Sequence, residues 1–257
     1  MNTAHKIFQD KVAIVTGAGQ GIGFEICRQL AIQGAHVILN DVEKSLATDA
    51  AEKIKREKGV CVPMAGDVSD VDFIQTMVEK AITQFGSVDI AIANAGITMF
   101  GDFLDYEPDD FYNVMRVNLG GTFFLAQAAA RQMKEQRQGG SLLFMSSVTG
   151  HQAHKNLAAY SMSKAAVEML AKSLVIELSP HKITVNALAP GATLTERTTK
   201  DAGYEKVWAQ LTPTGRAATV ADIASAALFL VSPQAQHITG QTLVIDGGWS
   251  SISPSPY

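Results

Sequence analysis

The feature that most constrains the fold is a glycine-rich segment near the start of the chain. A short apolar run over 12–16 leads directly into Gly17-Ala-Gly-Gln-Gly-Ile-Gly23, and an amphipathic pattern over 21–33 predicts a helix behind it. Glycines permit a tight turn and let a phosphate group approach the backbone, while a helix N-terminus offers free N–H groups and a positive dipole end. A strand, a glycine-rich turn and a helix in this order therefore predict a pyrophosphate-binding turn. The alternative is a glycine-rich turn that holds no ligand.

The rest of the chain alternates short β-branched runs with longer amphipathic stretches. Most of the expected strands are continuous apolar runs, which is typical of a parallel sheet buried on both faces. They cover 12–16, 36–40, 60–65, 90–93, 141–145, 184–187 and 242–245. The expected helices cover 21–33, 43–58, 71–85, 108–136, 158–179 and 220–231, with Ser69 as the N-cap of the third. The sequence therefore predicts an α/β fold, a doubly wound (Rossmann) domain with a seven-stranded, mostly parallel sheet and helices on both faces.

We expect the chain to form a single domain, 1–257. An α/β domain of this length buries most of its unfolded surface and needs no disulfide or metal to hold it together. Residues 194–216 are polar and lack a strong period, and a long insertion of that kind is more often a substrate lid than an ordinary surface connection. The tail over 249–257 is expected to dock on a neighbouring subunit or to fray.

Composition argues against several other classes of protein. The formal net charge of -4 does not suit a nucleic-acid-binding surface, which would be basic and clustered. The start of the chain has no signal-peptide pattern and no run is apolar enough for a membrane span, so we expect a cytoplasmic protein. Cys27 and Cys61 lie far apart in apolar surroundings, and we expect two buried thiols rather than a redox or metal pair.

Asp41, at the end of the second expected strand, bears on which dinucleotide the turn would hold. A carboxylate there can accept hydrogen bonds from the adenosine ribose of NAD, and it would repel the 2′-phosphate of NADP by roughly 4 kcal/mol per charge pair at about 4 Å. Neither Gln20 in the turn nor Val42 after the strand supplies a basic side chain for that phosphate. The sequence therefore favours NAD, and the alternative is that Asp41 only caps the following helix.

Tyr160 and Lys164 are four residues apart in an expected helix, so their side chains share one face. A phenol is a weak base at neutral pH, and an ammonium group beside it stabilises the phenolate. Tyr-x-x-x-Lys is a weak pattern by itself, but Ser147 follows the strand at 141–145, where ligands of open α/β sheets bind. Its hydroxyl could hold a substrate oxygen while Tyr160 transfers the proton, and no metal ligand set is visible.

Taken together, these motifs resemble the short-chain dehydrogenase/reductase family over nearly the whole chain. The matching segments are Thr16-Gly-Ala-Gly-Gln-Gly-Ile-Gly23, Asp67-Val68, Asn94-Ala-Gly96, Asn118, Ser147 with Tyr160-Ser-Met-Ser-Lys164, and Asn186-Ala-Leu-Ala-Pro-Gly191. One departure is Ala93, which stands where the family usually has a first asparagine before Asn94.

The resemblance implies roles for several of these residues. Asn118 resembles the family asparagine whose helix kink holds a water in a proton relay to Lys164, and Asn94 the residue that steadies the central strand. The catalytic residues implied are Asn118, Ser147, Tyr160 and Lys164. The cofactor contacts implied are Gly17, Gln20, Gly21, Ile22, Gly23, Asp41, Asp67, Val68, Asn94, Ala95, Gly96, Tyr160, Lys164, Pro190, Gly191, Thr193 and Thr195.

The expected activity is hydride transfer between NAD and a secondary alcohol or its ketone, of the sugar, polyol or hydroxy acid class. Two alternatives are a 3-oxoacyl-thioester reductase and a dinucleotide-binding regulator without catalysis; members labelled 3-oxoacyl-carrier-protein reductase and glucose 1-dehydrogenase look most similar. Polar residues such as His151 and His154 favour a hydroxylated substrate, although exposed loop histidines are the simpler interpretation. The resemblance also implies a homotetramer, built on the helices over 108–136 and 158–179 and on the last strand.

Overall fold

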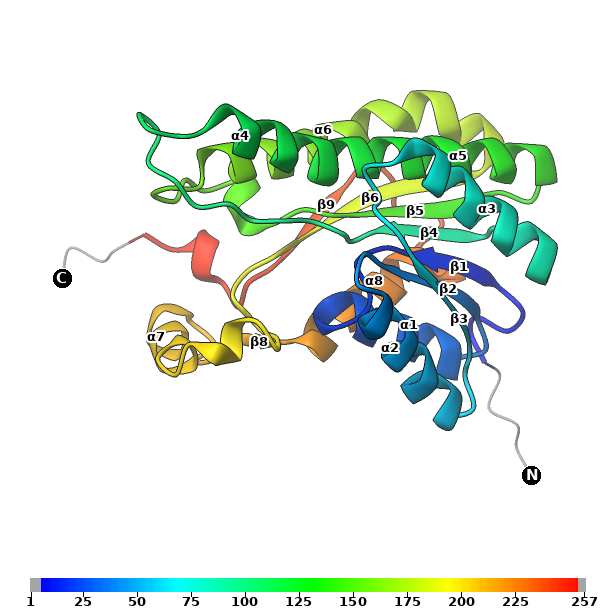
Figure 1. Ribbon diagram of the computed structural model, residues 1–257, viewed down its shortest axis with the longest axis horizontal. Helices are drawn as coiled ribbons and strands as arrows, with labels where there is room; N and C mark the ends of the chain where they lie inside the picture. Colours follow the sequence, from blue (N-terminus) through cyan, green and yellow to red (C-terminus); the bar gives the residue numbers. More distant parts are fainter. Residues whose placement is uncertain (1–5, 254–257) are drawn as a thin grey trace.

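The computed structural model describes residues 6–253, and it confirms the predicted α/β fold (Figure 1). Seven strands form one sheet in the order β3-β2-β1-β4-β5-β6-β9, and every neighbouring pair is parallel. The strands are β1 Val12–Val15, β2 His36–Asp41, β3 Val60–Ala65, β4 Ile90–Ala93, β5 Gly140–Met145, β6 Ile183–Pro190 and β9 Thr242–Ile245. The chain reverses its direction of travel across the sheet between β1 and β4, and such a switch point opens a crevice at the carboxyl ends of the strands.

Helices cover both faces of this sheet (Figure 1). One face carries α1 Gly21–Ile32, α2 Lys44–Arg56 and α8 Val220–Val231, and the other α3 Val71–Phe85, α5 Gly121–Gln136 and α6 Ala158–Leu178. Alternate strand residues enter the two cores because side chains along a strand point to opposite faces. Val15 packs in the core with α1, whereas Ile14 packs in the core with α3 and α5. This double burial explains the continuous apolar runs in the sequence.

The predicted helix over 108–136 is not continuous, and that prediction was wrong. Helix α4 Pro108–Val114 passes into a π-helical stretch, Met115–Gly120, before α5 begins. Asn118 lies in this stretch, and its side-chain amide exchanges hydrogen bonds with the backbone of Ile97 on a neighbouring segment. A wider turn inside a helix is often found at a functional site.

The expected N-cap of α3 was also wrong by one residue. The cap is Asp70, whose carboxylate accepts hydrogen bonds from the backbone N–H of Asp72 and Phe73 at 2.9 and 3.3 Å. The backbone N–H of Ser69 instead donates to the Asp67 carboxylate at 2.8 Å, which closes a local turn before the helix. A carboxylate suits this place because it faces the positive end of the helix dipole.

The segment over 194–216, expected to be irregular, contains a helix. Helix α7 Tyr204–Leu211 lies beyond the carboxyl ends of the strands (Figure 1), and a two-stranded pairing of β7 Thr193–Leu194 with β8 Ala218–Thr219 closes the base of the segment. Trp208 of α7 packs edge-to-face on Trp249, with ring centroids 5.2 Å apart. We call residues 194–216 the lid segment; its role as a substrate lid stays a prediction.

Other boundaries differ by a few residues, most of all in β6, which is longer at both ends than the expected 184–187. Trp249 begins a short 3₁₀ turn after β9, and residues 254–257 of the expected tail lie outside the described residues. Across 6–253, no helix combines the length and the apolar character needed to cross a membrane.

Candidate active site

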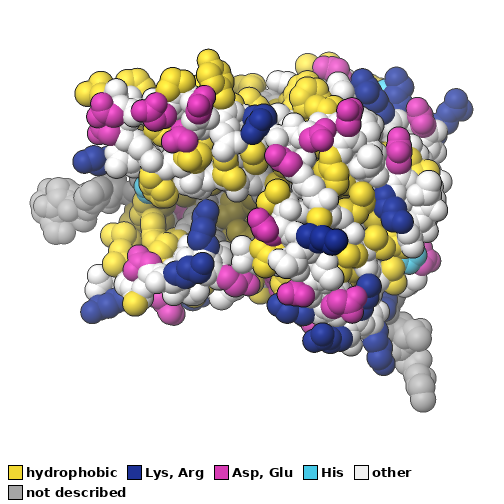
Figure 2. Space-filling model, viewed as in Figure 1, with side chains coloured by type: hydrophobic (Ala, Val, Ile, Leu, Met, Phe, Trp, Pro, Cys, Tyr) yellow, Lys and Arg dark blue, Asp and Glu magenta, His cyan; other side chains and the backbone are white. Residues whose placement is uncertain are grey.

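Two adjoining cavities open at the carboxyl ends of the strands. The larger, which we call the groove, has a volume of about 460 Å³ and runs past the glycine-rich turn and the end of β2. The smaller, which we call the inner cavity, has a volume of about 210 Å³ and lies beyond the ends of β5 and β6. Ile22, Asn94, Gly96, Thr195 and Arg197 line both. In the space-filling view the surface is hollowed between the upper layer of helices and the lid segment (Figure 2).

The glycine-rich turn lines the groove with backbone. Gly17 and Gly21 have φ angles of +59° and +62°, a left-handed conformation that favours glycine. A Cβ at Gly17 would lie 2.6 Å from the Cα of Ala95, so the turn also needs glycine for its packing. No side chain within 6–253 caps the N-terminus of α1, and the first residues of this helix line the groove. These free N–H groups at a helix N-terminus fit a pyrophosphate.

Asn94 holds the glycine-rich turn against the end of β4. Its side-chain amide donates to the backbone oxygens of Thr16 and Gly17 at 3.0 and 2.8 Å. In return, the hydroxyl of Thr16 accepts hydrogen bonds from the backbone N–H of Asn94 and Ala95. The two strands on either side of the switch point are thus joined where they reach the groove.

Asp41 ends β2 with its carboxylate turned toward the glycine-rich turn. The side chain is buried, and it accepts hydrogen bonds from the backbone N–H of Gly19 at 2.9 Å and of Glu43 at 3.1 Å. It therefore ties the turn to Glu43, the residue before α2, but no described side chain caps that helix, and Asp41 also lines the groove together with Asp67. Among the described residues, Arg197 is the only lysine or arginine that lines the groove.

Tyr160, Lys164 and Ser147 meet in the inner cavity. Lys164 is 4% exposed, its Nζ donates to the backbone oxygen of Met145 at 2.8 Å, and it lies 5.5 Å from the centre of the Tyr160 ring. Ser147 follows β5 and begins a 3₁₀ turn, in which its hydroxyl accepts from the backbone N–H of Thr149. The helix α6 and the end of β5 thus bring a phenol, an ammonium and a hydroxyl to one place.

Asn118 lies behind this cavity and does not line it. Its Oδ1 accepts from the backbone N–H of Ile97 at 2.8 Å, and its Nδ2 donates to Ile97 O and to the hydroxyl of Ser163, each at 3.0 Å. A Cβ placed on Gly96 would lie 3.2 Å from Lys164 Nζ and 3.3 Å from Asn118 Oδ1. A side chain at position 96 would therefore crowd both the buried ammonium and the buried amide.

The structure brings together almost all of the residues predicted for the site. Those that line the groove are Gly17, Gln20, Gly21, Ile22, Gly23, Asp41, Asp67, Val68, Asn94, Ala95, Gly96 and Thr195. Those that line the inner cavity include Ser147, Tyr160, Lys164, Pro190, Gly191, Thr193 and Thr195. Their contacts with cofactor and substrate remain a prediction.

A buried carboxylate under the Ser147 loop was not foreseen from the sequence. Glu168 Oε1 lies 2.5 Å from the hydroxyl of Ser146 and 3.0 Å from Nε2 of His151. Glu168 follows Lys164 by one helical turn, and that spacing is the signal that could have identified it. It connects α6 to the loop that carries Ser147.

Tyr204 and Arg197 of the lid segment also line the inner cavity and were not predicted. Burial raises the pKa of Tyr204, although a hydrogen bond from the Thr193 backbone and the charge of Arg197 act in the opposite direction. Tyr204 therefore remains a neutral phenol at physiological pH. His151 and His154 do not line the cavity; the ring of His154 packs in a tilted arrangement against Trp249, with ring centroids 5.1 Å apart.

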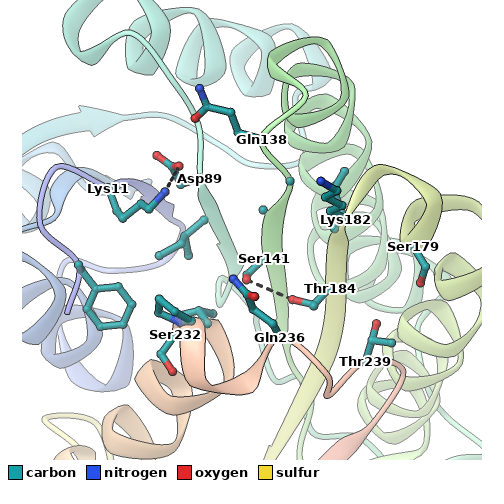
Figure 3. Close-up of a pocket in the computed structure, with 17 residues that line it drawn as sticks. Lys11, Asp89, Gln138, Ser141, Ser179, Lys182, Thr184, Ser232, Gln236 and Thr239 are labelled. Atoms are coloured by element: carbon teal, nitrogen blue, oxygen red, sulfur yellow. Dashed lines mark hydrogen bonds and ion pairs between the residues drawn. The ribbon is translucent and has the colours of Figure 1, made fainter.

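A third cavity, of about 380 Å³, lies at the opposite, amino edge of the sheet (Figure 3). Four of its polar side chains interact in two pairs: Lys11 Nζ lies 2.8 Å from Asp89, and the hydroxyl of Thr184 lies 3.1 Å from that of Ser141. Cys27 and Cys61 are buried free thiols elsewhere in the fold, and burial raises the pKa of both. Within 6–253 no group of three His, Cys, Asp or Glu side chains is arranged to hold a metal.

Comparison with known proteins assigns the chain to a family. Residues 17–250 match the family model described as enoyl-(acyl carrier protein) reductase. L-Rhamnose 1-dehydrogenase (NAD(P)+) of Azotobacter vinelandii is 36% identical, over 93% of this chain and 96% of that protein. The chain belongs to the short-chain dehydrogenase/reductase family. The predicted resemblance is confirmed, and as a member of this family the protein is an NAD(P)-dependent oxidoreductase acting on CH–OH groups.

Two further members of the short-chain dehydrogenase/reductase family are similar over nearly their whole length. A 2-dehydro-3-deoxy-D-gluconate 5-dehydrogenase of Dickeya dadantii is 33% identical, over 94% of this chain and 96% of that protein. A crystal structure of a gluconate 5-dehydrogenase from Burkholderia cenocepacia, in complex with NADP and tartrate, superposes with a TM-score of 0.89 at 33% identity and covers 97% of this chain and 100% of that one.

Proposed function

We propose that this protein is an NAD-dependent dehydrogenase that interconverts a secondary alcohol and its ketone, with Tyr160 as the acid/base. The observation that supports it most is the meeting of Tyr160, Lys164 and Ser147 in a small cavity that opens into the groove beside the glycine-rich turn. When bound, the nicotinamide supplies the acceptor for the hydride. The remaining work, which is to position the alcohol and remove its proton, falls to side chains of this chain.

In this mechanism the hydroxyl of Ser147 donates a hydrogen bond to the substrate oxygen and holds it near the phenol of Tyr160. Tyr160 accepts the hydroxyl proton as the carbonyl forms, and it returns the proton in the reverse direction. Lys164 places a positive charge beside the ring, where it stabilises negative charge that develops on the phenolic oxygen. Asn118 acts from behind through the backbone of Ile97, by keeping in place the segment after β4 that lines the groove.

The preference for NAD over NADP rests on Asp41. Its buried carboxylate lines the groove at the end of β2, where the adenosine ribose binds in dinucleotide folds. A 2′-phosphate there would meet a negative charge, and no lysine or arginine of β2 or of the glycine-rich turn lines the groove to offset it. Relatives named for NAD(P)+ or bound to NADP show that the family uses both nucleotides, so the choice belongs to this proposal.

The substrate class we propose is a hydroxylated small molecule, a sugar, polyol or hydroxy acid. An inner cavity of about 210 Å³ lined by hydroxyl-bearing side chains suits such a molecule. The names of the relatives, an L-rhamnose dehydrogenase and two dehydrogenases of gluconate-type sugar acids, support the same class.

A homotetramer in the cytoplasm completes the proposal. Apolar side chains remain exposed on α5 and α6, among them Phe123, Met169 and Ile176, and on β9, where Leu243 is 40% exposed. Exposed apolar faces of this kind are typical of subunit interfaces. Light scattering on the purified protein tests the tetramer, and cell fractionation tests the location.

The decisive experiment is a screen for NADH formation with NAD and a panel of sugars, polyols and hydroxy acids. We expect turnover with at least one panel member and slower turnover when NADP replaces NAD. Tight NAD binding without turnover of any alcohol or reduction of any ketone would contradict the proposal and favour a dinucleotide-binding regulator.

A further inference from the structure

The charged side chains that line the inner cavity are all positive. Among the described residues, two cationic side chains line it, Lys164 and Arg197, and no aspartate or glutamate does. The other titratable side chains on its wall are the phenols Tyr160 and Tyr204, and burial keeps Tyr204 neutral. The protein as a whole is acidic, with a formal net charge of -4, so this local excess of positive charge runs against the overall balance.

Of the two cations, Arg197 is the one whose N–H donors have no partner among the described residues. Lys164 is buried with its Nζ on the backbone oxygen of Met145, whereas the side chain of Arg197 is exposed. Among residues 6–253, Arg197 takes part in no ion pair. The neighbouring Glu196 lines the groove and not the inner cavity. A guanidinium offers five N–H donors in a planar fork that matches a carboxylate.

The backbone around Arg197 is held by its neighbours. The hydroxyl of Thr198 accepts from the backbone N–H of Thr195 at 2.8 Å and donates to the backbone oxygen of Thr193 at 2.9 Å. All three threonines also line the inner cavity. Arg197 is therefore presented by an ordered turn at the opening between the groove and the cavity, on the side of the lid segment.

We propose that Arg197 binds a carboxylate of the substrate, so that the enzyme acts on a hydroxy acid and its oxo acid in preference to a neutral alcohol. The inference rests on the proposed function and narrows its substrate class. An oxidised nicotinamide carries a further positive charge, which makes the cavity still more favourable to an anion. Because Arg197 also lines the groove, its alternative partner is a phosphate of the dinucleotide, and the experiment separates the two.

The test compares acids with neutral partners of similar size. Tyr160→Phe protein loaded with NAD cannot complete the proton transfer, so binding is measured without turnover. Calorimetric titrations use D-gluconate against D-glucitol and 3-hydroxybutyrate against 1,3-butanediol. We expect the acid of at least one pair to bind about tenfold to a hundredfold more tightly than its partner, and that preference to fall by at least tenfold when Arg197→Met is added.

Two variants serve as controls. Arg197→Lys keeps the charge but loses the planar guanidinium, so it should retain part of the preference for the acid. Lys200 belongs to the same segment and lines neither cavity, so Lys200→Met should leave that preference intact. Equal binding of acid and neutral partner in both pairs would overturn the proposal. So would an Arg197→Met protein whose affinity for NAD drops while the acid preference stays, since that result assigns Arg197 to the dinucleotide.

These outcomes are distinct from failure of the proposed function. If neutral alcohols are oxidised as well as acids, the dehydrogenase stands and the role of Arg197 is wrong. If no alcohol of either kind is oxidised by the unmodified protein, the dehydrogenase itself is wrong, whatever the titrations show.

Discussion

The two edges of one parallel sheet carry cavities of similar size and opposite character. At the amino edge, the buried carboxylate of Asp89 accepts from Lys11 Nζ, from the Val12 backbone N–H and from the Ser87 hydroxyl. At the carboxyl edge, α1 begins without a side-chain cap, and Arg197 has no acidic partner among the described residues. Volume does not distinguish the two edges, but the buried charge of each does: Asp89 is paired with Lys11, whereas Lys164 forms no ion pair among the described residues. A buried charge that its neighbours satisfy contributes to stability, and one without a counter-ion beside a cavity is suited to a ligand.

We expect the largest effect from removing the phenol of Tyr160 at the carboxyl edge. Tyr160→Phe keeps the ring and loses the proton carrier, so we expect kcat to fall by about 10²–10⁴-fold with stability little changed. Steady-state assays measure kcat, and urea unfolding measures the stability. Tyr112→Phe, on an exposed tyrosine of α4, is the matched control. An intact kcat in Tyr160→Phe would show that the proton is carried elsewhere.

At the amino edge the comparison predicts the reverse outcome. Asp89→Ala leaves the Val12 N–H and the Lys11 ammonium without their acceptor, so we expect a loss of about 2–4 kcal/mol in the free energy of unfolding. Turnover per folded molecule should be unchanged. Lys11→Ala, on the half-exposed partner, should cost much less. Loss of turnover in a stable Asp89→Ala protein would mean that the amino edge also serves the reaction.

A third prediction concerns the groove. Asp41→Asn removes the negative charge but keeps an oxygen for the Gly19 N–H, so the ratio of kcat/KM for NAD to that for NADP should fall by about tenfold or more. Melting temperatures with and without each nucleotide provide an independent measurement. An unchanged ratio would show that Asp41 does not determine the choice of nucleotide and only accepts hydrogen bonds from the backbone of Gly19 and Glu43.

We expect the smallest effect from a substitution of Asp222, which lies just after the end of the lid segment. Asp222 forms a capping box with Thr219 at the start of α8 and pairs with Arg216. Hydrogen bonds from the Arg216 guanidinium and the Thr219 backbone hold the pKa of Asp222 well below its usual range. A lowered folded pKa stabilises the fold above the unfolded value near 4, and this contribution is lost as pH falls further.

Asp222→Asn should therefore cost about 1 kcal/mol at pH 7, a figure discounted for the exposure of the pair, and the difference from the unmodified protein should shrink below about pH 4. Urea unfolding at both pH values measures it. A difference that grows on acidification would contradict the assigned cause.

Much of the fold could be predicted from the sequence because its signals are local. The glycine-rich turn after an apolar run specifies a strand, a turn and a helix within about a dozen residues. The alternation of apolar strands with amphipathic helices specifies a covered parallel sheet. Tyr160 and Lys164 lie on one helix, so their spacing predicts that they share a face, and both line the inner cavity.

Only the tertiary structure decided the features that depend on contacts between distant segments. The π-helical stretch around Asn118 accompanies bonds to Ile97, and α7 packs its Trp208 on Trp249 from beyond the last strand. No local pattern indicates such partners. Helical periodicity therefore predicted one unbroken helix over 108–136, and it did not predict α7. The same holds for the site. Sequence alone predicted which residues would carry the chemistry and that a parallel sheet would gather them. Packing decided that Arg197 reaches the inner cavity while the neighbouring Glu196 does not, because which wall a side chain joins depends on how the lid segment folds over the sheet.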